Sequence, residues 1–197
     1  MSLSELLSTY GGNYASALLS TWGMTAVCFA IVMVVAVLVT VLRVCPFKPL
    51  RWLGDLYVQV FRNIPGVSLL IIIVYALPSL NVVLDYRVCV MTTVVLVAAA
   101  FGSENFMSGI RKIVIPQALR TTVLPMTNLL IAVMLTTSLG SQVPLDPQEL
   151  TGVVSYINTR DAGGVLAFAI SAAGYALTAL AIGFAGNRID RKVRIER

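Results

Sequence analysis

ASALLSTWGMTAVCFAIVMVVAVLVTVL, residues 15–42, contains no charged side chain and is followed directly by Arg43. A transmembrane helix needs about 20 consecutive apolar residues, so this stretch is long enough to cross a membrane. Further long apolar stretches follow along the chain, and Glu104 is the only charged residue inside them. The sequence therefore predicts an all-α membrane protein with five transmembrane helices, near residues 16–42, 63–84, 88–110, 121–140 and 163–187.

The basic residues collect in alternate connections between these stretches. Of the 14 Lys and Arg residues, only Arg87 and Arg160 fall on one side of the predicted bundle. Short loops rich in Lys and Arg stay in the cytoplasm, so we predict the N-terminus outside the cell and a cytoplasmic C-terminus. This arrangement accounts for the net charge of +5. Membrane lipid is the expected environment, and no nucleic-acid partner is expected.

The composition narrows the possible chemistry. Hydrophobic residues make up 58% of the chain and charged residues 12%, proportions that do not suit a water-soluble domain. The absence of histidine excludes histidine-activated nucleophiles and histidine metal ligands. Cys28, Cys45 and Cys89 lie far apart and indicate apolar packing rather than a disulfide or zinc site. We therefore expect no metal site and no catalytic residues.

Two shorter segments have helical periodicity outside the predicted spans. Residues 50–61 follow the helix breakers Pro46 and Pro49, and we interpret them as an interfacial elbow helix on the cytoplasmic face. The alternative is a longer second span that begins obliquely. Residues 147–158 are predicted to form a short external amphipathic helix, with Asp146 as its capping residue.

Glu104 is the one ionisable residue well inside a predicted span. Acids within a membrane are costly, and they usually pair with a base or face water. At a rise of 1.5 Å per residue, Glu104 lies roughly 24 Å from the outer end of its span, at the depth of Arg62. Arg111 lies on the same helical face two turns further along. We interpret Glu104 with Arg62 or Arg111 as a structural ion pair, and the alternative is a proton or substrate site.

The last two predicted spans carry stripes of small and polar residues. In the fourth span, Asn128 and Thr136 lie on one helical face. An amide inside a membrane needs hydrogen-bonding partners, so we interpret this face as the wall of a polar pathway. The stripe on the fifth span favours close helix packing, and its members are Gly164, Ala167, Ser171, Gly174 and Thr178.

Five short motifs occur in order along the chain: RNIP at 62–65, Glu104 followed by SGI at 108–110, IVIPQALR at 113–120, TSL at 137–139 and ELT at 149–151. Together they resemble the inner-membrane permease subunits of polar amino-acid ABC importers, the histidine/glutamine/glutamate class. IVIPQALR is the most specific of the five. Within this class the chain is most similar to actinobacterial glutamate permease subunits.

The resemblance implies a type I ABC importer permease fold and ATP-driven import of a polar amino acid, glutamate or a relative, by alternating access. It also implies a second permease subunit, identical or different, two cytoplasmic ATPase subunits that bind ATP and Mg, and an extracellular solute-binding protein. The expected location is the bacterial inner (plasma) membrane. This chain has no phosphate-binding glycine-rich lysine loop, so we expect it to bind no cofactor and not to be an enzyme.

Two groups of residues are candidates for roles in transport, and the resemblance contributes to both. The candidate substrate pathway combines Asn128 and Thr136 of the polar stripe with Thr137 and Ser138 of the TSL motif. The candidate ATPase-coupling region consists of Arg111, Lys112, Pro116, Gln117 and Arg120.

Two departures from the family matter for function. The family carries a Glu-Ala-Ala-x-x-x-Gly motif upstream of Pro-Gln-Ala-Leu-Arg, on the helix that contacts the ATPase, whereas here Ile110 runs directly into Arg111. Either the chain lacks this coupling loop, or residues are missing from the sequence at this point, and the family-like flanks favour the second. Met134 and Leu135 also stand where relatives often carry charged or amide side chains, so this span offers no charge to a substrate.

Two functions of other classes remain open. One is an ion-coupled or proton-coupled carrier built around Glu104. Uptake that depends on an ATPase would exclude this carrier. The other is a degenerate or non-transporting membrane scaffold, which the missing coupling motif favours. Co-purification with an ATPase argues against the scaffold.

Overall fold

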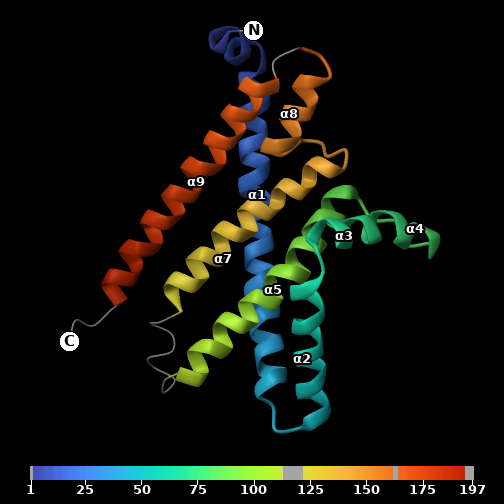
Figure 1. Ribbon diagram of the computed structural model, residues 1–197, viewed down its shortest axis with the longest axis vertical. Helices are drawn as coiled ribbons and strands as arrows, with labels where there is room; N and C mark the ends of the chain where they lie inside the picture. Colours follow the sequence, from blue (N-terminus) through green and yellow to red (C-terminus); the bar gives the residue numbers. More distant parts are fainter. Residues whose placement is uncertain (1, 113–121, 162–163, 194–197) are drawn as a thin grey trace.

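The computed structural model describes residues 2–112, 122–161 and 164–193, and all regular structure within these ranges is helical (Figure 1). Helices α1 to α5 belong to the first range, and α7 to α9 belong to the other two. In chain order the elements are α1 (Leu3–Val44), α2 (Lys48–Asn63), α3 (Gly66–Ile71), η1 (Ile72–Ala76), α4 (Leu77–Ser79), α5 (Tyr86–Lys112), α7 (Val123–Thr136), η2 (Thr137–Gln142), α8 (Leu150–Asn158) and α9 (Gly164–Val193).

Four helical segments of the described residues are long and apolar enough to cross a membrane. They are α1, α5, α7 continued by η2, and α9. A fifth candidate span is formed by α2 and the α3–α4 segment, which meet at an angle of 103°. Length and composition therefore indicate a multi-pass membrane protein with four spans, or five if the bent pair is one span.

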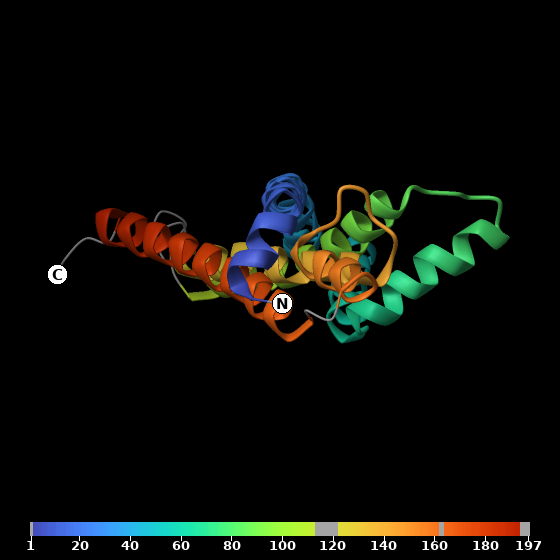
Figure 2. The same ribbon diagram turned by 90° about the horizontal axis from the view of Figure 1, so that it is seen from above.

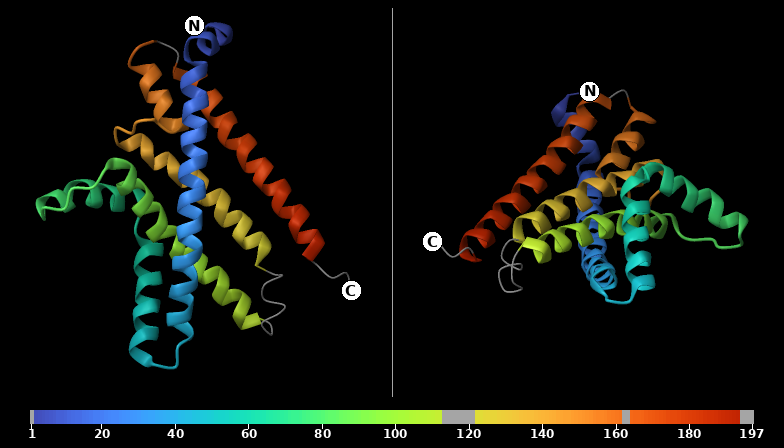
Figure 3. Two further views of the ribbon diagram at one scale, coloured as in Figure 1. Left: turned by 180° about the vertical axis from the view of Figure 1, so that it is seen from behind. Right: turned by 60° about the horizontal axis from the view of Figure 1, so that its bottom comes forward.

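Helix α1 lies along one face of the molecule. Its 42 residues give a length of about 63 Å at 1.5 Å per residue, more than a hydrocarbon core of about 30 Å. A capping box begins the helix: the Ser2 backbone N–H donates to the Glu5 carboxylate at 2.7 Å, and the Glu5 N–H donates to Ser2 Oγ at 3.3 Å. Figure 3 shows α5, α7 and α9 crossing behind α1 obliquely.

The segment that follows α1 differs from the prediction. The predicted elbow helix corresponds to α2, which runs antiparallel to the lower half of α1 and packs against it (Figures 1 and 3). The chain bends sharply at Ile64 and Pro65, at the start of the predicted span 63–84, and the helical segment after the bend covers residues 66–79 only. Proline has no backbone N–H and disfavours a helical conformation in the residue before it, which ends α2 here. Seen from above, the α3–α4 segment projects away from the bundle at the end opposite α9 (Figure 2).

Helix α5 continues without a break through Ile110 and Arg111 to Lys112. The structure follows the printed sequence here, with no loop between the two residues, so the interpretation that residues are missing at this point stays a prediction. The connection from α5 to α7 falls outside the described residues.

Two apolar clusters hold the helices together. The larger one joins α1, α3, α5 and α7, and its fully buried members are Cys28, Val32, Val90, Val94 and Val133. The second joins the outer part of α1 to α7, α8 and α9, and its fully buried members are Leu6, Met134, Ile157 and Ala167. Helices α1 and α5 approach closely at Gly102, where an added Cβ atom would lie 2.8 Å from the Cβ of Ala36.

Replacing Gly102 by Ala should destabilise the protein, because α1 and α5 must separate to admit the new methyl group. Overpacking of this kind costs about 1–3 kcal/mol, which exceeds the gain in helix propensity. The matched control is Gly23→Ala in α1, where an added Cβ meets no atom within 4 Å. Thermal denaturation in detergent should show a lower melting temperature for the first variant only, and equal melting temperatures would contradict the close contact.

Candidate functional site

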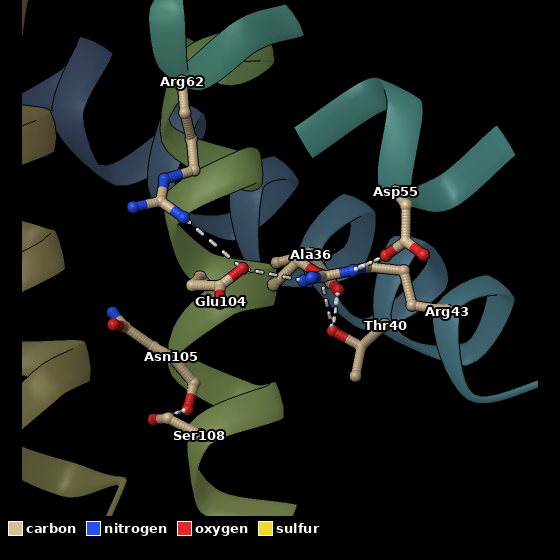
Figure 4. Close-up of polar contacts among 9 residues, drawn as sticks. Ala36, Thr40, Arg43, Asp55, Arg62, Glu104, Asn105 and Ser108 are labelled. Carbon is tan, nitrogen blue, oxygen red and sulfur yellow. Dashed lines mark hydrogen bonds and ion pairs between the residues drawn. The ribbon is translucent and has the colours of Figure 1, made fainter. Parts of the chain in front are cut away.

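Glu104 lies where α5 passes α1 and α2, and two arginines approach its carboxylate (Figure 4). Arg62 Nη1 lies 3.5 Å from Glu104 Oε2, so the ion pair expected from the sequence is present. Arg43 Nη1 is closer, at 3.0 Å from the same oxygen. Sequence reasoning missed Arg43, because this residue was counted only as the charge that ends the first span. The side chain of Arg111 lies outside the described part of the structure.

Arg43 is the centre of this network. Its side chain is only 8% exposed, and its Nε donates to Asp55 Oδ1 at 2.9 Å. Its Nη1 also donates to Ser103 Oγ at 3.3 Å, and Thr40 Oγ1 lies 3.1 Å from that same oxygen. The guanidinium thus connects α1 to two carboxylates, one on α2 and one on α5. Pairing of this kind compensates the cost of placing charge in a bundle of low polarity.

Two of the four candidate pathway residues share one groove. Asn128 and Thr136 line a cavity of about 430 Å³ between α5 and α7. Phe101 and Asn105 of α5 line the same cavity. The Asn128 side chain is exposed, and within the described residues no hydrogen bond reaches it. We call this cavity the α5–α7 groove.

The other two pathway residues lie elsewhere. Thr137 is fully buried and donates to the Met134 carbonyl at 2.6 Å. Ser138 lines a different cavity, of about 680 Å³, between η2, α8 and α9. The structure therefore does not bring the four residues together in one site.

The stripe of small residues on α9 packs against neighbouring helices, as the sequence indicated. Ala167 and Ser171 are buried, and Ser171 Oγ donates to the Leu150 carbonyl at 2.6 Å. Gly174 faces the Leu150 side chain, whose Cδ1 would lie 3.2 Å from an added Cβ. This part of α9 therefore holds α8 in place.

Sequence reasoning also missed a second polar cluster, around Glu149. Helix α8 begins at Leu150 with Glu149 as its N-cap, so the prediction that Asp146 caps a helix from residue 147 is wrong. The fully buried Glu149 carboxylate accepts hydrogen bonds from the N–H groups of Thr151 (2.7 Å) and Gly152 (2.6 Å) and from Tyr175 Oη (2.6 Å). The Leu150 N–H donates to Thr21 Oγ1, which adds α1 to the cluster.

Burial raises the pKa of the Glu149 carboxyl above its usual value of 4.5, and the hydrogen bonds from Tyr175, Thr151 and Gly152 oppose this shift. Within the described residues, no Lys or Arg forms a salt bridge with this carboxylate. Glu149 thus ties α8 to α9 through neutral donors alone.

The remaining candidate residues carry no site in the described structure. Pro116, Gln117 and Arg120 of the candidate coupling region lie outside the described residues, as do the side chains of Arg111 and Lys112. Among the residues that are described, no group of three or more His, Cys, Asp or Glu could hold a metal ion.

Removing the two arginines one at a time should have unequal effects on stability. Arg43→Gln leaves Asp55 and Glu104 without their closest partner inside the bundle and should cost about 1–3 kcal/mol. Arg62→Gln removes a pair whose members are 39% and 37% exposed, and should cost less than about 1 kcal/mol. Thermal denaturation of the two variants in the same detergent measures the difference, and equal losses would contradict the central place of Arg43.

Glu149 should make stability depend on pH. The folded state raises the pKa of this carboxyl, so its contribution to stability is largest below about pH 4.5 and falls as the pH rises through the folded-state pKa. Glu149→Gln keeps the shape of the side chain but cannot ionise. The melting temperature of the wild type minus that of the variant should therefore fall between about pH 4 and pH 8. A difference that stays constant or rises over this range would contradict the raised pKa.

Comparison with models of known protein families finds no match for this chain. Two curated relatives match most of it. The L-cystine transport system permease protein TcyB of Bacillus subtilis is 27% identical over 172 residues, covering 76% of this chain and 73% of the relative. The glutamate transport system permease protein GluC of Corynebacterium efficiens is 24% identical over 200 residues, covering 84% of this chain and 87% of the relative.

A solved structure has the same fold. An amino acid ABC transporter crystallised with histidines superposes on 94% of this chain with a TM-score of 0.89 and a sequence identity of 17%, and the match covers 96% of that chain. Its fold and the two curated relatives agree with the resemblance stated from the sequence motifs. The chain is therefore a homologue of the permease subunits of amino-acid ABC importers, and it has their fold.

Proposed function

We propose that this chain is the membrane-spanning subunit of an ATP-driven importer that moves a polar amino acid, glutamate or a close relative, across the bacterial inner membrane by alternating access. The observation that carries the proposal is the match to amino-acid permeases over most of the chain, together with the shared fold. GluC supports glutamate in particular, because that relative is a glutamate permease.

The α5–α7 groove is the candidate route for the solute. It contains the amides of Asn105 and Asn128 and the hydroxyl of Thr136 among apolar side chains. Such a lining can hydrogen-bond to a polar amino acid at several depths without holding it at one place. Two helices of one chain line this groove, and in this proposal a second permease subunit, identical or different, completes the route.

The other partners follow from the same assignment. Two cytoplasmic ATPase subunits bind ATP and Mg and drive the cycle, and an extracellular solute-binding protein delivers the amino acid. The coupling contacts belong to Arg111, Lys112, Pro116, Gln117 and Arg120. This chain contributes conformational change and a route for the solute, and it contributes no covalent chemistry.

The geometry of Glu104 favours the importer over an ion-coupled carrier. A carboxylate that binds and releases protons or ions during transport has to be free in part of the cycle. Glu104 lies within 3.5 Å of two guanidinium groups and forms a salt bridge with each of them. A non-transporting scaffold remains the second candidate, because the family's coupling motif is absent between α5 and IVIPQALR.

Reconstitution of the chain with its second permease subunit, ATPases and solute-binding protein tests the function. Proteoliposomes should accumulate labelled glutamate only with ATP and with an active ATPase. Asn128→Trp should lower the uptake rate at least about tenfold, because the indole fills the groove, while the ATPase stays bound. The control Val34→Trp places the same side chain on an exposed position of α1 (60% exposed), and should leave uptake unchanged.

Each alternative has its own outcome in this experiment. Accumulation that persists without ATP would indicate an ion-coupled carrier. A complex that assembles with an active ATPase but accumulates no amino acid would indicate a scaffold.

A further inference from the structure

The α5–α7 groove has no charged residue in its lining, yet a cation lies beside it. The guanidinium of Arg62 lies over the ring of Phe101, with Cζ 5.3 Å from the ring centroid. Phe101 lines the groove, and it also lines a neighbouring polar pocket of about 370 Å³ that contains Arg62 and Glu104. The ring therefore separates the charge of Arg62 from the groove by the thickness of one side chain.

The two arginines of the network differ in how firmly they are held. Arg43 is 8% exposed and has partners on Asp55, Ser103 and Glu104. Arg62 is 39% exposed, and within the described residues its only salt bridge is the 3.5 Å contact to Glu104. If Arg62 turns toward another carboxylate, Glu104 keeps its closer partner Arg43. Arg62 can therefore exchange Glu104 for another carboxylate without leaving Glu104 unpaired.

We propose that Arg62 is the residue that attracts the carboxylate of a solute in the α5–α7 groove, with Glu104 and Phe101 positioning its guanidinium beside the groove. The inference rests on the proposed function and adds to it a specificity-determining residue. The amides and the hydroxyl of the groove can hydrogen-bond to a carboxylate, but they cannot neutralise it. A guanidinium does both, because its planar donors match the two oxygens of a carboxylate.

The charge can be measured in the full-length chain in membrane vesicles without knowing the solute. Asn128→Cys places a thiol in the groove, and Cys45→Ser removes the one native cysteine that is not buried. The probes are an anionic and a cationic methanethiosulfonate reagent of similar size. The ratio of their reaction rates reports the electrostatic potential at the thiol.

Arg62→Gln should lower the ratio of anionic to cationic rates by about tenfold, because the two probes carry opposite charges. Arg62→Lys should restore most of the ratio. The control Arg51→Gln removes an exposed charge from the same helix, and should leave the ratio unchanged. Thr136→Cys, in the same groove, provides a second position with the same expected pattern. A ratio that does not respond to Arg62, or thiols at both positions that react with neither probe, would overturn the proposal.

Uptake separates the failure of this inference from the failure of the proposed function. In the reconstituted complex, Arg62→Gln should lower ATP-dependent glutamate uptake at least about tenfold, and Arg62→Lys should recover part of it. Normal uptake by Arg62→Gln overturns the role of Arg62 and leaves the importer intact. The importer is overturned instead if the wild-type complex takes up no amino acid while the ratio of anionic to cationic reaction rates still depends on Arg62.

Discussion

The pairing of Glu104 with Arg43 is the interaction on which the arrangement of the helices depends. A carboxylate inside a transmembrane segment has to be paired, because the surrounding hydrocarbon offers it neither water nor counter-ions. The closest base is supplied by the end of α1, and Asp55 of α2 holds that base from the other side. Three helices are thereby fixed in rotation about their axes. With Glu104 directed at α1 and α2, the neighbouring Asn105 and Phe101 contribute to the groove that α5 forms with α7.

A second polar anchor holds the part of the bundle around α8. Glu149 links α8 to Tyr175 of α9, and the N–H of Leu150 binds Thr21 of α1. Between the two anchors, α1 and α5 meet through small residues, with Gly102 against Ala36. Close packing and polar anchors thus lie along α1, whereas the groove is lined by α5 and α7.

Much of this fold could be predicted from the sequence. Long uncharged stretches predicted the spans formed by α1, α5, α7 and α9, and Glu104 stood out as an acid that needed a base. The division into one helix before Ile64 and Pro65 and another after them was predicted, but hydrophobicity could not give the angle of 103° between the two. Arg43 was missed because it was counted only as the charge that ends the first span, and its approach to Glu104 depends on how α1 packs against α5. Thr137 and Ser138 were grouped with Asn128 by motif, although their places on the helix direct them to other surroundings.

A double-mutant cycle between Arg43 and Glu104 tests most directly whether this pair organises the bundle. The free energies of unfolding of Arg43→Gln, Glu104→Gln and the double variant are compared with that of the wild type in one detergent. The double variant should be more stable than the sum of the single losses implies, with a coupling energy of about 1–3 kcal/mol. The reason is that each single variant leaves the other member of the pair as a charge without this partner, whereas the double variant removes both charges. Losses that simply add would contradict the account, because the two residues would then act independently.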